Sequence, residues 1–132
     1  LIIVIATGFS LITKQPENDP PLYNVKITAP DSEEESVTDQ IATALSDNNN
    51  WDRENIMVDI QIEREKFAKG GVSLEGEVGG GLWFAAKING SWEIVFDGNG
   101  IITCDQLTDY PDFPTDMIPS CYNIQTEKLI TR

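Results

Sequence analysis

Acidic side chains are the groups in this sequence most able to do chemistry, and one set lies between the two cysteines. The set consists of Asp105, Asp109, Asp112 and Asp116. Carboxylate oxygens suit Ca²⁺, so a constrained loop of this kind could hold a weak calcium site outside the cell. The competing interpretation is a solvated acidic loop that binds no metal.

A second carboxylate pair, Glu75 and Glu77, flanks Gly76. Residues at i and i+2 of a strand share a face, and paired carboxylates perform acid–base hydrolysis in glycosidases. The chain has no histidine, which excludes Ser-His and Cys-His nucleophile arrangements. A small carboxylate-dependent hydrolase is therefore one hypothesis, although a non-enzymatic role is favoured.

The run FDGNGII, from Phe96 to Ile102, has the aspartate, asparagine and glycine spacing of a calcium loop. The first ligand and the final bidentate glutamate of an EF-hand are missing, and a strand precedes the run instead of a helix. We expect a tight turn that ends a hairpin.

The two cysteines, Cys104 and Cys121, form an even pair. Two thiols without a histidine make a poor zinc site, whereas an even count in an oxidising compartment favours one disulfide. The alternative is two free, buried thiols in a cytosolic protein. A disulfide would place the domain in the cell envelope or outside the cell.

The charge balance is strongly acidic, with 9 Lys+Arg against 22 Asp+Glu and a formal net charge of -13. This charge repels phosphate backbones and anionic headgroups, so nucleic acid and anionic membrane surfaces are poor partners. The acidity serves solubility or attracts cations and basic partners.

The N-terminal run LIIVIATGFSLI is apolar but too short to span a bilayer by itself. Residues 1–13 are interpreted as the remnant of a membrane anchor or signal, and a buried strand is the alternative. Residues 14–21, with three prolines, form an extended linker. Residues 22–132 form one domain, attached to the membrane through the N-terminal segment only.

Period-two alternation predicts a strand over 22–28, and an amphipathic helix follows it. Ser32 and Glu35 form a capping box at the expected helix start, and Asn48 to Asn50 stop the helix. Residues 56–63 alternate between apolar and mostly polar side chains, which predicts a strand whose isoleucines and Val58 face inward. The strand is expected to continue over 64–69, with a bulge near Phe67. Gly70-Gly71 breaks the run, and 72–78 form a weaker strand.

Asn89-Gly90 between two apolar runs predicts a two-residue type I′ hairpin. In that register Lys87 lies opposite Trp92 as a cation–π pair, and Trp83 lies opposite Phe96 as an aromatic pair. Both faces of the hairpin are mostly apolar, so both are covered. The helix is one cover, and the C-terminal segment, a second subunit or a ligand is the other. Any exposed aromatic surface would bind through Trp83, Lys87, Trp92 and Phe96.

The C-terminal part, 101–132, contains Pro111, Pro114 and Pro119 and is expected to be loop-like, with a short strand over 122–130. The expected fold is α+β: one amphipathic helix packed on a four- to five-stranded antiparallel meander with a disulfide-closed C-terminal loop. The order β-α-β-β-β-β is cystatin-like in topology only. The cystatin signature Gln-x-Val-x-Gly is absent from the sequence, so protease inhibition is not carried over.

The run FAKGGV…GGGLWFAAKINGSWEIVFDGNGIITCDQL…FPTDMIPSCYN, from Phe67 to Asn123, carries a resemblance. It resembles a family of small uncharacterised bacterial proteins, largely from candidate-phylum lineages, that have an N-terminal membrane segment. The resemblance implies an anchored extracytoplasmic domain with paired cysteines, and it implies no reaction.

These features together favour a membrane-anchored extracytoplasmic domain that binds or scaffolds, with a protein partner or a second copy as possible ligands. No cofactor is expected beyond weakly bound Ca²⁺. A pilin-like or secretion-apparatus subunit is a second hypothesis, because such subunits join an apolar N-terminus to a sheet and a disulfide-closed loop. The hydrolase is the third.

Overall fold

The computed structural model describes residues 34–132 of the chain. The anchor, the linker and the first strand expected at 1–13, 14–21 and 22–28 lie outside the described residues. The elements in order are α1 (Val37–Asn49), η1 (Arg53–Asn55), β1 (Ile56–Glu63), β2 (Phe67–Leu74), β3 (Gly81–Ile88), β4 (Ser91–Gly98), η2 (Asp105–Leu107), β5 (Ser120–Asn123) and β6 (Lys128–Thr131).

Helix α1 begins one turn later than the capping box at Ser32 and Glu35 predicts. Its N-cap is Ser36, whose side chain accepts a hydrogen bond from the backbone N–H of Asp39. Both serines are followed by an acidic residue three positions on, and Ser36 lies directly before the apolar stripe. Ile41, Ala42 and Leu45 of this stripe are buried. Packing of an apolar face stabilises a helix more than local sequence preferences do, so the helix begins where the stripe begins and not at the acidic run before it.

The four long strands form one antiparallel sheet in the order β1-β2-β3-β4. Strand β2 runs through Gly70-Gly71, so the strand break predicted there is wrong. A Cβ added at Gly70 would lie 1.8 Å from the carbonyl oxygen of Asp59 and 2.8 Å from the ring of Trp83. The glycine is therefore a close-approach position beneath a buried indole and does not interrupt the strand.

The predicted hairpin turn is confirmed: Asn89 and Gly90 have φ angles of 51° and 83°, as a type I′ turn requires. The pairing Lys87↔Trp92 is confirmed, but the pairing of Trp83 with Phe96 is wrong. A bulge after Ala85↔Ile94 shifts the register, so Trp83 lies opposite Asp97 and Phe84 lies opposite Phe96. Phe96 consequently packs on the other face of the sheet from Trp83.

A second bulge interrupts the pairing of β1 with β2 between Ile60 and Ile62. Val58 and Ile60 pack with the helix-side core, whereas Ile62 packs with the core on the opposite face. The expectation that Ile62 shares the inward face of its neighbours is therefore wrong. The bulge lies before the position near Phe67 where the sequence suggested one.

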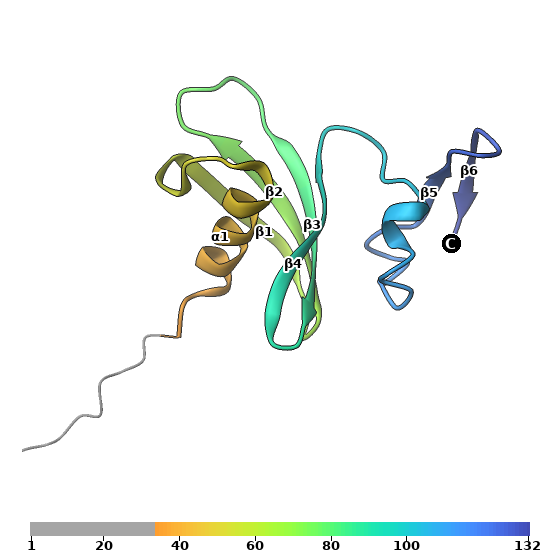
Figure 1. The fold of residues 1–132 in the computed structure, drawn as a ribbon, viewed down its shortest axis with the longest axis horizontal. Helices are drawn as coiled ribbons and strands as arrows, with labels where there is room; N and C mark the ends of the chain where they lie inside the picture. The colour runs from red at the N-terminus through yellow and green to blue at the C-terminus, as the bar shows by residue number, and fades with distance from the viewer. Residues whose placement is uncertain (1–33) are drawn as a thin grey trace, which may run out of the picture. The chain divides into compact units, whose positions relative to one another are not determined.

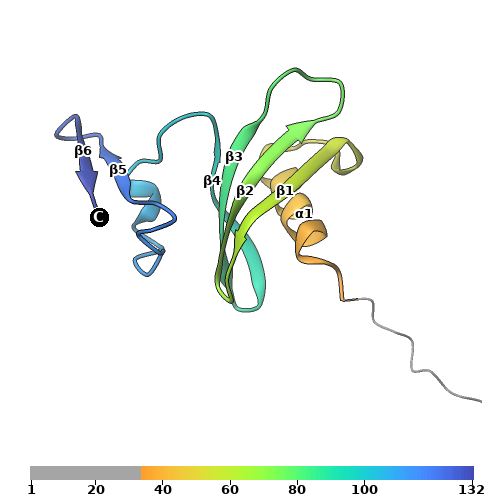
Figure 2. The ribbon, with the colours of Figure 1, turned by 180° about the vertical axis from the view of Figure 1, so that it is seen from behind.

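The sheet is covered on both faces, as the two apolar faces of the hairpin predict. Figures 1 and 2 show α1 on one side of the sheet and the C-terminal segment, residues 101–132, on the other. The helix-side core contains Ile41, Leu45, Val72, Trp83 and Trp92. The C-terminal-side core contains Val95, Ile102, Leu107, Phe113, Met117 and Ile118.

The C-terminal segment is held by the disulfide Cys104–Cys121, which confirms the predicted pairing. The expected single strand over 122–130 is instead a two-stranded hairpin of β5 and β6. Phe113 contacts Phe67 of the sheet with ring centroids 4.9 Å apart. Within residues 34–132, no helix is long and apolar enough to cross a membrane.

Candidate cleft between the hairpin turns and the C-terminal loop

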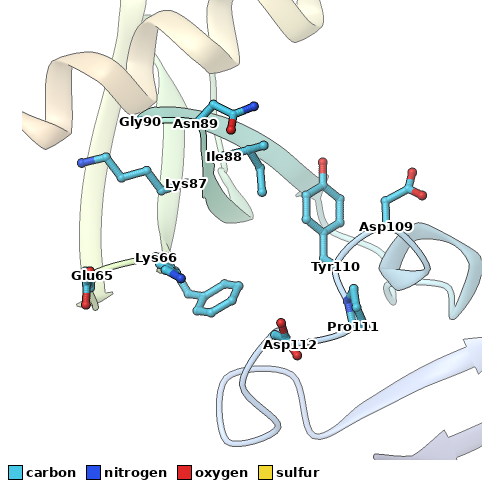
Figure 3. Close-up of a pocket in the computed structure, with 11 residues that line it drawn as sticks. Glu65, Lys66, Lys87, Ile88, Asn89, Gly90, Asp109, Tyr110, Pro111 and Asp112 are labelled. Atoms are coloured by element: carbon cyan, nitrogen blue, oxygen red, sulfur yellow. The ribbon is translucent and has the colours of Figure 1, made fainter.

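A cleft of about 560 Å³ lies between one end of the sheet and the C-terminal segment. Its sheet wall comes from two turns and the strand ends beside them: residues 65–67, which lead from β1 into β2, and residues 87–90, which end β3 and turn toward β4. Its other wall is the loop 109–112. Figure 3 shows these residues around the opening. The volume is within the range of small-ligand pockets.

Backbone hydrogen bonds next to the strand ends hold the sheet wall of the cleft in place. The backbone N–H of Lys87 donates to the carbonyl of Lys66 at 2.8 Å, and that of Arg64 donates to the carbonyl of Phe67 at 2.8 Å. Both turns are therefore fixed relative to each other. Ile88, which is 37 % exposed, presents an apolar side chain at this wall.

The loop wall is irregular in backbone conformation but firmly attached. Turn hydrogen bonds run from the N–H of Tyr110 to Leu107 and from the N–H of Phe113 to Tyr110. The guanidinium of Arg132, at the other end of the segment, donates to the carbonyls of Ile118 and Phe113, at 3.0 Å each. Preorganised walls of this kind reduce the ordering cost of binding.

An ion pair between Arg64 and Asp116 ties the β1–β2 connection to the loop segment. The hydrogen bond from Arg64 is the main reason that the pKa of Asp116 is lowered from its ordinary value. Because both side chains are well exposed, this bond positions the segment more than it stabilises the fold.

Tyr110 is the aromatic residue of the loop wall. Its hydroxyl donates to the carboxylate of Glu93 on β4 at 3.1 Å. Burial raises the pKa of Tyr110, and the hydrogen bond to Glu93 and the charges of Glu93 and Asp109 raise it further. The phenol therefore stays neutral, beside a locally negative group of carboxylates.

Within residues 34–132, the charged side chains of the cleft form no salt bridges. In residues 34–132 the ion pairs are Arg53–Asp39 and Arg64–Asp116, and neither uses a residue that lines the cleft. Lys87 is directed away from Tyr110 (Figure 3), and its ammonium lies 5.7 Å from the ring centroid of Trp92. That contact confirms the predicted cation–π pair.

The predicted aromatic binding surface is not an exposed surface. Trp83 is fully buried and donates its indole N–H to the carbonyl of Gly71 at 2.8 Å, while Trp92 is 7 % exposed. Phe96 is half-buried on the opposite face. Of the four predicted binding residues, only Lys87 lines the cleft. A mostly apolar hairpin marks core as readily as it marks a contact surface.

The predicted calcium ligands are not brought together. All four aspartates are exposed, and residues 34–132 contain no group of three or more metal-ligating side chains. Asp116 pairs with Arg64, Asp105 begins η2, and only Asp109 and Asp112 line the cleft. The four carboxylates therefore point to different places, and they do not form the predicted calcium site within the described residues.

The Glu75 and Glu77 pair lies in the exposed connection between β2 and β3. Glu77 lines a separate hollow of about 240 Å³ that also contains Trp51, and Glu75 does not line it. The two carboxylates therefore share no pocket. Asp97 of the calcium-like run accepts hydrogen bonds from the side-chain amides of Asn48 and Asn49 at the end of α1, which is a helix-to-strand tie.

Sequence patterns pointed to three cleft residues, Lys87, Asp109 and Asp112, and missed others. Tyr110 and Asn89 carried no ligand-binding signal, because a turn asparagine and a tyrosine between acidic and proline residues are ordinary loop features. Only the folded domain brings them to the same cleft.

Comparisons with family models, curated proteins and solved structures find no match for this chain.

Proposed function

We propose that this protein is a non-catalytic binding domain of the cell envelope or the extracellular space, held at the membrane by its N-terminal segment. The disulfide supports the compartment, because cytosolic thiols are kept reduced. The apolar run at 1–13 and the resemblance to N-terminally anchored bacterial proteins support the attachment.

The cleft between the hairpin turns and loop 109–112 carries the proposal of binding. Its walls combine apolar groups, Phe67 and Ile88, with charged groups that form no salt bridge in the described part of the chain, residues 34–132. A concave site with a few convergent polar groups on rigid supports is the usual form of a small-ligand site. The walls are joined by the Arg64–Asp116 pair and by the Phe67–Phe113 contact, so the site exists before a ligand arrives.

The test is ¹⁵N–¹H NMR of the full 132-residue chain, titrated separately with short peptides, chitotriose, diamines and dicarboxylates. We expect at least one probe class to shift the amides of Asn89, Gly90, Tyr110 and Asp112 selectively. Asp112→Trp places a large side chain at the opening and should abolish those shifts.

Asp105→Trp is the matched control, because Asp105 is also exposed and lies outside the cleft. This variant should bind like the unmodified chain. Absence of cleft shifts with every probe class would contradict the proposal. Shifts that survive Asp112→Trp would place binding elsewhere and contradict it equally.

A further inference from the structure

We propose that the cleft receives a ligand bearing a primary ammonium or guanidinium group, which the acidic, aromatic loop wall binds. This inference rests on the proposed binding function and names the chemistry of the ligand. Two sources present that group: a free polyamine, or a lysine or arginine side chain of a polypeptide.

The carboxylates of the loop wall provide the negative charge that binds the cation. Asp109 and Asp112 line the cleft, and within residues 34–132 neither side chain takes part in a salt bridge or hydrogen bond. Figure 3 shows Asp109 and Tyr110 extending in the same direction from the loop. The carboxylate of Glu93, which accepts the hydrogen bond from the Tyr110 hydroxyl, adds a third negative group next to that hydroxyl.

The lysines of the sheet wall do not cancel this charge. Lys87 points away from the loop wall, and its ammonium lies over Trp92 in the other core. Lys66 follows Glu65 directly in the β1–β2 turn, and both line the cleft, so their charges offset each other at that rim. The charged side chains that line the cleft are Glu65, Lys66, Lys87, Asp109 and Asp112, and they sum to a formal charge of -1, with the excess negative charge at the loop wall.

Aromatic and apolar groups complete a site for an organic cation. Tyr110 and Phe67 line the cleft, and a ring face attracts an ammonium or guanidinium group through its quadrupole. Ile88 and the ring of Pro111 can cover the alkyl stem of such a ligand. Burial is the largest cause of the raised pKa of Tyr110, and the nearby charges of Glu93 and Asp109, which a bound cation would offset, raise it further.

The charge of the whole chain acts in the same direction. A formal net charge of -13 raises the local concentration of cations and steers basic ligands toward the surface. Dicarboxylates and other anions are repelled by the same field. Neutral ligands gain nothing from it.

The experiment titrates the full chain with 1,5-diaminopentane, with the peptide acetyl-Gly-Lys-Gly-amide, and with two neutral counterparts. The counterparts are 1,5-pentanediol and the same peptide acetylated on its lysine. We expect the amine probes to shift Tyr110, Asp112 and Asn89, with at least tenfold weaker binding by the neutral counterparts. Tighter binding of the diamine than of the peptide identifies a free amine as the ligand type, and the reverse order identifies a polypeptide side chain.

Asp109→Asn with Asp112→Asn should weaken amine binding about tenfold, because it removes two carboxylate contacts that are each worth up to about fivefold. Asp105→Asn with Asp47→Asn is the matched control. It removes the same formal charge from exposed positions outside the cleft and should change affinity less than about twofold.

The outcomes separate this inference from the proposed function. Equal cleft binding of amine and neutral probes, or cleft binding by dicarboxylates alone, overturns the cation inference and leaves a binding domain. Equal weakening by the two double variants overturns the role of Asp109 and Asp112. Silence of the cleft toward every probe overturns both proposals.

Discussion

The two faces of the sheet are covered in different ways. On one face a single helix buries Ile41 and Leu45 against Trp83 and Trp92. On the other face an irregular segment with three prolines buries Phe113, Met117 and Ile118. The backbone N–H and C=O groups of the helix form hydrogen bonds with one another. The irregular segment is instead held in place by turn hydrogen bonds, a disulfide and the side chain of Arg132.

The contrast explains why the cleft lies on the irregular side. A helix presents a continuous apolar stripe and packs closely against a sheet. A segment without regular structure can carry charged side chains at a sheet margin and still be fixed, as residues 109–112 are. The helix side of this domain provides stability, and the C-terminal side provides the surface on which we place binding.

The helix-side core should be the most sensitive to substitution. Trp83→Ala removes a fully buried indole and its hydrogen bond to Gly71, and should cost about 3–5 kcal/mol of unfolding free energy. Urea denaturation measures this cost, with Trp83→Phe as a milder control that keeps most of the buried ring. A loss below about 1 kcal/mol would contradict the central place of Trp83 in this core.

The disulfide should matter less for the whole fold and more for the C-terminal side. Replacing both Cys104 and Cys121 by serine should cost about 3 kcal/mol, because the unfolded chain regains the freedom that the closed loop removes. Tryptophan emission should remain that of buried indoles below the transition, since Trp83 and Trp92 lie in the helix-side core. Emission typical of exposed indoles in native buffer would show that the two sides are not separable.

The Arg64–Asp116 pair should give the smallest effect, visible as a pH dependence. The pKa of Asp116 is lowered from 3.8 by Arg64, so the stabilising contribution is present above that value. It is lost as the pH falls through the lowered pKa of the folded state. Melting temperatures from about pH 6 to pH 2 should fall less steeply for Asp116→Asn than for the unmodified chain. Asp112→Asn, without an ion pair, is the control, and equal slopes for all three proteins would contradict the assignment.

Much of the framework follows from local patterns in the sequence. The apolar spacing of 37–45 predicts the helix, Asn89-Gly90 predicts the hairpin turn, and the cysteine pair predicts the disulfide, all confirmed by the structure. The mixed apolar faces of the hairpin predict a sheet covered on both sides. These features depend on residues close in sequence, or on cysteines that have only one possible partner.

The tertiary structure alone decided which side chains are exposed and which come together. Bulges in β1 and β4 move Ile62 and Phe96 to the opposite face, because one extra residue reverses the alternation of side chains. The cleft joins segments 65–67, 87–90 and 109–112, and the pattern within each segment carries no information about the other two. Local patterns determine elements because backbone preferences act over a few residues, whereas a site made by distant segments exists only after the chain has packed.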